Sequence, residues 1–329
     1  MITRPTDPTP NVHGRFQSPP AATAVASVIV TYNPPPGLND RLRVVLRETD
    51  FAVVVDNGSD RTPDFEGLAA HDRSRIHLIS NRSNVGLAAA LNQGIAASAE
   101  LGATMALTLD HDSTPRAGMV RKLMEARNQD ECPQTIAAVV PTIAYAHPDI
   151  RCRWPKSAPG RRMRFHFAFA ARLAGPTTVD LAISSGMLIH VDTWRKVGRF
   201  DEDLFIDLVD TDFCLRSRAL GFHILAAPSA ILDHHLGDVK KNHLLGLMPV
   251  FPTHHSALRH YYIGRNRVLL AKRHARRFPS WLIYELLGAA KLTAKVALFE
   301  PGRGQKLISM CKGTWDGMRR TPSQWKQGP

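Results

Sequence analysis

The sequence predicts an α/β protein whose mostly parallel sheet is flanked by helices. Apolar segments rich in β-branched residues alternate with helical segments along the first third of the chain, an order typical of a doubly wound sheet. The segments expected as buried strands are 26–33, 51–55, 76–79 and 105–109. Polar residues follow three of them, at the strand ends where open α/β sheets bind their ligands.

Local chemistry supports each of these elements. The strand at 26–33 stops at Pro34-Pro-Pro-Gly37, a run that cannot continue a strand. Segment 38–49 has apolar residues at helical spacing, and segment 87–99 is an alanine-rich helix. The run 105–109 carries no charge, as expected for a strand buried on both faces.

The second half of the chain predicts further elements around an irregular region. A helix is expected over 116–127, a strand over 135–145, a helical turn over 191–197, a short strand over 221–225, and helices from 259 and over 281–299. Segment 181–189 predicts a strand interrupted by Ser184-Ser185-Gly186, where glycine lets a ligand or another backbone approach. The basic stretch 147–178 is expected to be a flexible insertion or lid.

These elements divide the chain into three parts. Residues 1–24 contain five prolines and few large apolar side chains, which predicts a disordered leader. Residues 25–250 would form the α/β domain that carries the site, and 251–329 a helical, basic C-terminal extension.

The charge of the chain indicates an anionic partner. The 329 residues carry a net charge of +13, which suits a phosphate-rich substrate, an anionic membrane surface or nucleic acid. Nucleic acid is not expected, because the aromatic residues are not interleaved with basic ones and clustered carboxylates repel a phosphate backbone.

The sequence predicts a cytoplasmic protein. The four cysteines are widely spaced without a C-x-x-C pair, which favours reduced thiols over a zinc site or a disulfide framework. No secretory signal is visible at the N-terminus. The most apolar helix, 281–299, carries Glu285, Lys291 and Lys295, so it is not expected to span a bilayer. Beside the basic cluster 272–277, it fits either a membrane-surface element or a helix packed on the domain.

Two carboxylates, Asp110 and Asp112, end the strand at 105–109. Such a pair suits Mg²⁺ or Mn²⁺, which takes one or two carboxylates and completes its shell with phosphate and water. The same pattern is common in solvated turns, so alone it is weak evidence. His234 is a suitable third ligand for a cation already held by carboxylates.

A second acidic segment places Asp207, Asp210 and Asp212 at the start of a predicted helix. Acids there are stabilised by the helix dipole, which is a purely structural role. The bulky apolar neighbours Leu208, Val209 and Phe213 favour a working carboxylate equally well. The residues alone leave both interpretations open.

Eight segments together resemble the family-2 inverting glycosyltransferases of the GT-A fold, and most of all the bacterial rhamnosyltransferase branch that builds polysaccharide on lipid carriers. They occur in the family's order over about residues 26–270. The segments are V-I-V-T-Y-N (28–33), V-V-D-N-G-S (54–59), N-R-S-N-V-G-L-A-A-A-L-N (81–92), L-D-H-D-S (109–113), S-S-G-M-L-I (184–189), F-D-E-D-L-F-I-D-L-V-D-T-D-F-C-L-R (200–216), L-D-H-H-L-G-D (232–238) and R-H-Y-Y-I-G-R-N (259–266).

The resemblance implies a role for each matching residue. The nucleotide-sugar would be bound by Thr31, Asn33, Asp56, Asn57, Asn84, Gly86, Asn92 and Asp110. The acceptor or diphosphate region would contain Ser184, Ser185, Gly186, Asp207, Asp212, Arg265 and Asn266. Asp112 and His234 would bind the Mg²⁺ or Mn²⁺, and Asp210 would be the general base.

The chain departs from the family's pattern at two positions. Val209 stands where the usual Glu-Asp pair has its glutamate, and His111 replaces a glutamine common in the rhamnosyltransferase branch. The resemblance implies dTDP-rhamnose as donor and a glycan or lipid-linked glycan as acceptor, in cell-surface polysaccharide synthesis. The basic C-terminal helices would then contact the cytoplasmic face of the inner membrane peripherally.

Three alternatives remain open from the sequence. The first is a glycosyltransferase of the same fold that uses a UDP-sugar. The second is a nucleotidyltransferase, but this would need a glycine-rich, lysine-bearing loop where Pro34-Pro-Pro-Gly37 stands. The third is a non-enzymatic basic binding protein, which only the net charge supports.

Overall fold

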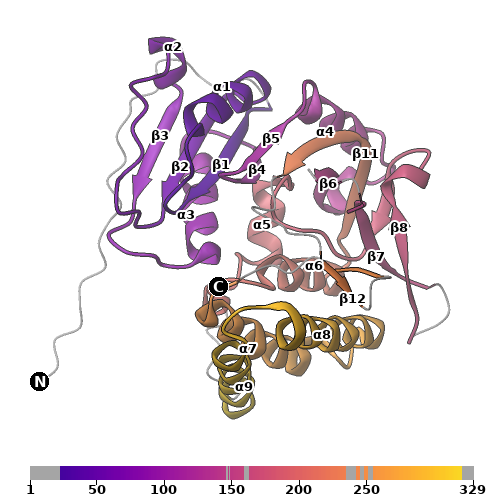
Figure 1. Ribbon diagram of the computed structural model, residues 1–329. Coiled ribbons are helices and arrows are strands. Elements are labelled where there is room, and N and C mark those ends of the chain that lie inside the picture. Colours follow the sequence, from indigo (N-terminus) through magenta and orange to yellow (C-terminus); the bar gives the residue numbers. More distant parts are fainter. Residues whose placement is uncertain are drawn as a thin grey trace, which may run out of the picture.

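A mixed nine-stranded sheet runs through the centre of the molecule, with helices on both faces (Figure 1). The computed structural model describes residues 23–145, 147, 149–158, 163–234, 242–244, 248–250 and 255–320. Nearly all of the predicted leader, residues 1–22, therefore lies outside the described residues.

One half of the sheet is parallel and lies in the N-terminal part of the chain. Its strands are β1 (Val25–Thr31), β2 (Phe51–Asp56), β3 (Ile76–Ser80) and β4 (Met105–Asp110). They run in the order β3-β2-β1-β4, and all residues of β1 and β2 are buried. Because all four strands point the same way, the residues after β1, β2 and β4 gather at one edge, as the sequence predicts.

The other half of the sheet is mixed. Its strands are β5 (Ser113–Pro115), β6 (Ile136–Tyr145), β9 (Thr177–Val179), β10 (Leu188–His190) and β11 (His223–His234). The order continues β4-β10-β6-β11-β5, and β9 also pairs with β11. The antiparallel pairing of β5 with β11 sets His234 opposite Ser113, which brings the end of β11 beside the residues that follow β4.

Helices cover the two faces of the sheet with separate apolar cores. One face packs against α1 (Leu38–Glu48) and α4 (Met119–Asn128). The other packs against α3 (Leu87–Glu100), α5 (Val191–Val197) and α6 (Val209–Ala219). The predicted class of a largely parallel sheet flanked by helices is confirmed. A short helix, α2 (Ala70–Arg73), precedes β3.

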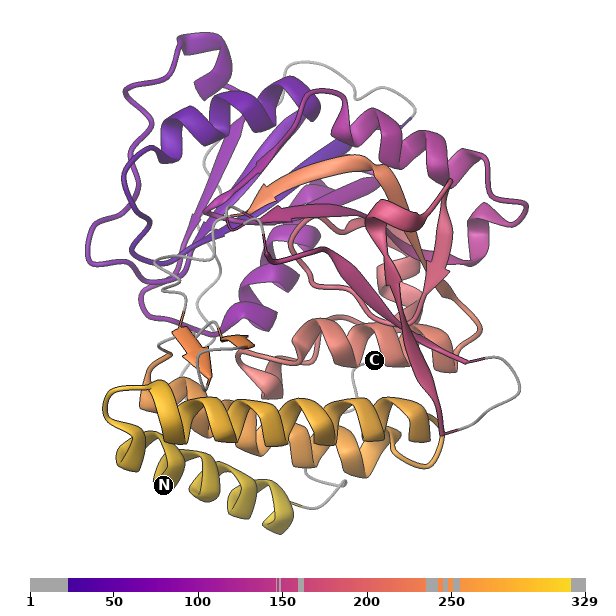
Figure 2. The same cartoon turned by 45° about the vertical axis from the view of Figure 1, so that its right-hand side comes forward.

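Three C-terminal helices complete the molecule: α7 (Ala257–His274), α8 (Pro279–Phe299) and α9 (Arg303–Arg319). They lie together below the sheet in Figures 1 and 2. Leu269 and Leu270 of α7 and Trp281 of α8 belong to the same apolar core as Phe200 and Phe213. The C-terminal helices therefore share a core with the α/β domain, although the sequence suggests an appended extension. Within the described part of the chain, no helix is long and apolar enough to cross a membrane.

The region predicted as an irregular lid contains a β-hairpin. A hairpin joins β7 (Arg153–Ser157) to β8 (Phe165–Phe169), and residues 159–162 lie outside the description. The rings of Phe165 and Phe167 pack edge-on against Tyr284 of α8, with centroids 5.3 and 6.1 Å away. The aromatic residues at 165, 167 and 169 alternate as in a strand. The sequence prediction of an irregular region rested instead on the many arginines of this stretch.

The strand predicted over 181–189 is shorter in the structure, where only Leu188–His190 pairs as β10. Gly186 adopts a φ of 88°, and its amide donates to the Thr108 carbonyl at 2.7 Å. A Cβ at this position would lie 2.7 Å from Pro141. The residues Ser184 to Gly186 therefore form a tight loop against β4 rather than a strand. Two short strands, β12 (Asn242–Leu244) and β13 (Met248–Val250), form a separate hairpin.

Candidate active site

A cavity of about 760 Å³ opens at the carboxyl ends of β1, β2 and β4, where the sequence predicts a ligand site. We call it the acidic cavity, because its walls include four carboxylates. The predicted site residues that line it are Asn57, Asn84, Asp110, Asp112, Ser184, Ser185, Asp207, Asp210 and His234. Half of the predicted residues thus converge on one space from segments far apart in the chain.

Asn57 organises one wall of the acidic cavity. Its side-chain amide donates to Asn84 Oδ1 at 3.0 Å and to the Gly86 carbonyl at 3.3 Å, and its Oδ1 accepts from the Val85 amide at 3.0 Å. Asp56 is buried beside it and accepts from the hydroxyls of Thr31 and Ser59 at 3.0 and 2.5 Å. The polar ends of β1 and β2 are therefore fixed before any ligand arrives.

Gly86 lets the acidic segment approach the helix α3. Its φ is 93°, and a Cβ there would lie 2.6 Å from the Phe205 ring and 2.8 Å from the Phe205 carbonyl. That carbonyl accepts from the Leu87 amide at 2.6 Å, at the N-terminus of α3. No side chain larger than hydrogen fits between these segments, so Gly86 shapes the cavity through its backbone.

Asp110, Asp112 and His234 form a candidate metal centre. Each offers a ligand atom, and these atoms lie within 4.8 Å of one another. His234 Nδ1 lies 3.5 Å from Asp112 Oδ1 and 2.7 Å from the Ser113 hydroxyl, which in turn lies 2.9 Å from the Ser185 hydroxyl. Two carboxylates and one imidazole suit Mn²⁺ or Mg²⁺ that also carries phosphate oxygens. Burial raises the pKa of Asp110, a cost that a bound cation would offset.

Asp210 lies in the first turn of α6 and faces the same cavity. Burial raises the pKa of its carboxyl to about 6, and the charges of Asp207 and Asp110 push in the same direction. Backbone hydrogen bonds from Thr211 and Ser184 offset part of this effect. A carboxylate with a pKa near neutrality is suited to take up a proton during a reaction.

The segment before Asp210 has a strained backbone that α7 holds in place. Phe205, Asp207 and Leu208 all have positive φ, between 62° and 64°. The Asn266 side-chain amide donates to the carbonyls of Leu204, Ile206 and Asp207 at 2.8, 2.8 and 2.9 Å. Left-handed conformations cost free energy in residues other than glycine and persist only where the surroundings enforce them. Asn266 supplies that enforcement.

Arg265 and Arg259 add two further attachments between α7 and this segment. Arg265 donates to the Asp203 carbonyl, and Arg259 forms a bidentate pair with the Asp207 carboxylate at 2.9 Å. Arg265 and Asn266 are buried and do not line the acidic cavity, contrary to the expectation that they contact acceptor or diphosphate. They act on the site through the backbone that they hold.

Asp212 and Asn92 also lie outside the acidic cavity. Asp212 is fully buried, and its carboxylate pairs with Arg216, Arg273 and His274 at 2.6 to 2.9 Å. Burial alone would raise its pKa, but the His274 hydrogen bond and the two arginines hold the pKa well below its usual range. Asn92 bonds the Phe200 backbone at 2.8 and 2.9 Å, so it supports the acidic segment rather than the nucleotide pocket.

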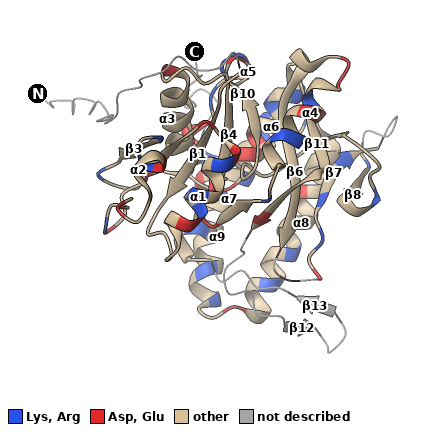
Figure 3. Ribbon diagram, turned by 90° about the horizontal axis from the view of Figure 1, so that it is seen from above, with Lys and Arg blue, Asp and Glu red and all other residues tan. Residues whose placement is uncertain are grey.

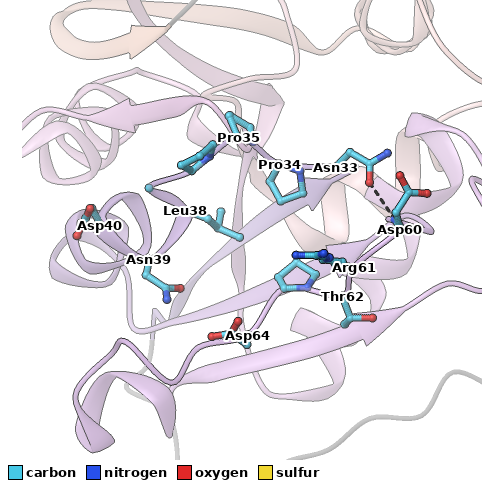
Figure 4. A pocket seen from close by; sticks show the side chains of 13 residues that line it. Asn33, Pro34, Pro35, Leu38, Asn39, Asp40, Asp60, Arg61, Thr62 and Asp64 are labelled. Atoms are coloured by element: carbon cyan, nitrogen blue, oxygen red, sulfur yellow. Dashed lines mark hydrogen bonds between the residues drawn. The ribbon is translucent and has the colours of Figure 1, made fainter.

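Asn33 faces a second cavity, of about 750 Å³, lined by the proline turn 34–36 and residues 60–64 (Figure 4). Its Oδ1 accepts from the Asp60 amide at 2.9 Å. Its neighbour Tyr32 lines the acidic cavity instead. Thr31 is buried and reaches neither cavity. The polar residues after β1 therefore face different cavities, and the chain leaves the extended conformation here, since Asn33 has a φ of 45°.

The lining of the acidic cavity also includes residues to which the sequence assigned no role, among them Tyr145, His255 and Arg259. Burial, with the nearby charge of Arg259, lowers the pKa of His255 to about 4, so its imidazole is neutral at pH 7. Arg259 is the only lysine or arginine that lines the acidic cavity among the described residues. The sequence did contain a signal for Arg259, because it is the first residue of the segment R-H-Y-Y-I-G-R-N, which matches the family.

Comparisons with known proteins agree with this geometry. Residues 27–192 match the family described as Glycosyl transferase family 2. The chain is 33% identical over 251 residues to a Shigella flexneri protein named dTDP-rhamnosyl transferase RfbF, covering 76% of this chain and 80% of that protein.

The fold has solved relatives. The crystal structure of S. aureus TarS 1-349 superposes with a TM-score of 0.57 at 11% identity, covering 90% of this chain and 81% of that one. The same protein in complex with UDP-GlcNAc gives 0.54 at 11% identity, covering 89% and 82%. The chain therefore belongs to glycosyltransferase family 2, is a glycosyltransferase, and has the GT-A fold.

Proposed function

We propose that this enzyme transfers rhamnose from dTDP-rhamnose, with inversion, to a glycan or lipid-linked glycan acceptor in cell-surface polysaccharide synthesis. The donor is inferred from the relative named dTDP-rhamnosyl transferase, which matches over three quarters of the chain. The chemistry is inferred from the acidic cavity, which combines a candidate metal centre with a separate carboxylate of raised pKa.

In this proposal Asp210 acts as general base in a single displacement. Its carboxylate accepts the proton of the acceptor hydroxyl as the hydroxyl oxygen bonds to the anomeric carbon. The bond from that carbon to the diphosphate oxygen breaks on the opposite side, which inverts the configuration. Asp110, Asp112 and His234 would hold a divalent cation that supplies positive charge to the leaving diphosphate.

Ser113 and Ser185 keep these groups in place. Ser113 contacts both His234 and Ser185, and the Asp110 amide donates to the Ser185 hydroxyl at 3.1 Å. Asn57 and Asn84 would face the nucleotide on the opposite wall. Arg259 pairs with Asp207 at the wall of the cavity. Its guanidinium would contact a phosphate of the donor while it keeps this pair.

A thermal-shift panel of dTDP, UDP and GDP, each with and without Mn²⁺, tests the donor. A ligand that binds only the folded state raises the midpoint of unfolding by mass action. We expect the largest shift with dTDP in the presence of Mn²⁺. A shift in the unfolding midpoint with UDP or GDP alone would show that the donor carries that nucleotide instead of dTDP. No shift with any nucleotide would contradict the proposed site.

Replacing Asp112 by alanine is expected to remove the metal-dependent part of dTDP binding. The cation would lose one of its two carboxylates, so Mn²⁺ should no longer strengthen binding, and the Mn²⁺ and EDTA titrations should coincide. Asp233→Ala is the matched control, because Asp233 lies beside His234 on β11 but pairs with Arg116 outside the cavity. If the wild type binds dTDP equally well with Mn²⁺ and with EDTA, the proposed role of a metal ion in dTDP binding is wrong.

Replacing Asn266 by alanine is expected to lower turnover more than donor affinity. Three carbonyls of the segment 204–207 would lose their shared donor, which costs about 1–3 kcal/mol of folding stability for a buried group. The same loss would loosen the backbone that positions Asp210. The measurement is kcat alongside the Kd of dTDP. A variant with unchanged kcat and lowered stability would show that Asn266 serves folding alone.

A further inference from the structure

Large apolar side chains are exposed at an unusual density on α8 and α9. Twelve large hydrophobic residues are exposed among the described residues, and six of them lie on these two helices. They are Leu286, Leu287, Leu298, Ile308, Trp315 and Met318, each 55–60% exposed. Single exposed apolar residues need no explanation, but a concentrated patch marks an interaction surface.

On α8 these residues belong to one continuous outward stripe. Ile283, Leu287, Ala290, Ala294 and Leu298 follow each other at intervals of three and four residues, so they share one side of the helix. The opposite side is buried through Trp281 and Val296. A helix packed on a soluble domain normally turns polar residues outward, and α8 does the reverse.

On α9 the inward side is fixed by close contact with α7. A Cβ at Gly313 would lie 1.9 Å from the Tyr261 carbonyl, and one at Gly317 would lie 2.7 Å from the Arg265 carbonyl. Ile308 and Trp315 lie on the other side of α9, away from these glycines, at a spacing of two turns. The outward sides of α8 and α9 are therefore defined by packing, and we call them together the α8–α9 face.

The exposed charges of this face are all basic. Over residues 279–320 the exposed charged side chains are Lys291, Arg303, Lys312 and Arg319. The three acids of the stretch are engaged elsewhere: Glu285 pairs with Arg267, Glu300 is buried against Lys306, and Asp316 accepts from Tyr261. Figure 3 shows the recurring blue positions along these helices.

The basic cluster that the sequence singles out, 272–277, is used inside the protein instead. Lys272 donates to three carbonyls at the end of α9, Arg273 pairs with Asp201 and Asp212, and Arg277 donates to the Ala219 carbonyl. Arg276 is the exposed arginine of the cluster to which these internal contacts do not extend, and the other exposed charges available for a partner at this end of the chain lie on α8 and α9.

We propose that the α8–α9 face docks on an anionic lipid surface. An apolar side whose exposed charged neighbours are all basic has the chemistry of an interfacial helix, whose apolar face enters the boundary between headgroups and acyl chains. Trp315 suits that boundary, since its ring is apolar and its N–H is polar. Lys291, Lys312 and Arg319 would meet the negative headgroups.

This inference goes beyond the transfer reaction and can be tested without donor or acceptor. The full-length protein is centrifuged with vesicles of phosphatidylcholine alone, or of phosphatidylcholine mixed with equal parts of phosphatidylglycerol. We expect it to pellet with the mixed vesicles only, and to be released by salt. A wild-type protein that stays in the supernatant with both compositions would overturn the proposal.

Matched variants distinguish vesicle binding through the α8–α9 face from non-specific binding by any exposed apolar residue or by net charge. Leu287→Glu should abolish pelleting, whereas Leu220→Glu, at an equally exposed leucine on the end of α6, should not. The triple change of Lys291, Lys312 and Arg319 to Gln should weaken binding on the order of 100-fold. The same loss of charge at Arg47, Arg121 and Lys196 should have little effect.

The same face could instead bind a second copy of this chain, and sedimentation distinguishes the two cases. If the wild type sediments as a dimer that Leu287→Glu dissociates, and neither binds vesicles, the face serves self-association and the lipid proposal is wrong. Transfer to a water-soluble acceptor, measured in parallel, should be equal in wild type and Leu287→Glu. Failure of vesicle binding with intact transfer would therefore leave the proposed reaction standing.

Discussion

Asp210→Asn is expected to lower kcat by at least about 100-fold while leaving dTDP binding nearly unchanged. The carboxylate faces the cavity from the first turn of α6, and no other acid of the 209–216 segment reaches that space. Asparagine keeps the shape of the side chain but cannot take up the proton of the acceptor hydroxyl. The measurement is single-turnover transfer beside a dTDP titration in the presence of Mn²⁺.

The pH profile of the wild type gives an independent check. Because burial raises the pKa of Asp210 to about 6, the base is protonated below that pH. The rate should therefore fall as the pH drops below about 6, and the residual activity of Asp210→Asn should not show that limb. Asp203→Asn is the control, since Asp203 lies in the same segment but outside the cavity. Normal turnover by Asp210→Asn would exclude it as the base.

The same raised pKa predicts the effect on stability. A carboxyl whose folded-state pKa lies above its unfolded value favours the folded state at low pH, and this contribution is lost as the pH rises through about 6. At neutral pH the wild type therefore bears the cost of a partly buried charge that asparagine lacks. Asp210→Asn should be as stable as the wild type or more so, which distinguishes a catalytic loss from misfolding.

The sheet and the location of the site could be predicted from sequence because both follow from local patterns. An uncharged apolar run that ends in Asp110 and Asp112 specifies a buried strand and a polar end, and parallel strands bring such ends together. The residues alone offered His234 as a ligand and Asp210 as one of three acids, and the resemblance to the family assigned their roles, since no spacing rule connects them to the first pair. The structure brings all four to one cavity.

The division of roles within 207–212 could not be predicted, because it depends on α7. Asp210 and Asp212 are two residues apart at a helix start and look equivalent in sequence. Their difference arises from Arg273 and His274, some 60 positions later, which surround only Asp212. The left-handed backbone of Phe205, Asp207 and Leu208 has no clear sequence signature either, since only Asp207 is of a residue type enriched in that conformation.

Asp212→Asn is accordingly expected to destabilise the fold by about 3–5 kcal/mol, the cost of breaking a buried charge pair by removing one partner. Arg216 would lose its carboxylate partner, and Arg273 would keep only Asp201 of its two. The measurement is urea denaturation at neutral pH, with Asp210→Asn as the matched control two residues away. If Asp212→Asn loses less free energy of unfolding than Asp210→Asn, the ion pairs of Asp212 do not stabilise the fold.

The pH dependence of this loss has a definite sign. Since the pKa of Asp212 is lowered by folding, its contribution to stability is present above the unfolded-state pKa of about 4 and disappears as the pH falls below it. The stabilities of wild type and Asp212→Asn should therefore converge in acid and separate towards neutral pH. The opposite slope is expected for Asp210, whose carboxyl is destabilising when charged. Two aspartates in one helical turn would thus give pH profiles of opposite sign, because one is surrounded by cations and the other is left free to accept a proton.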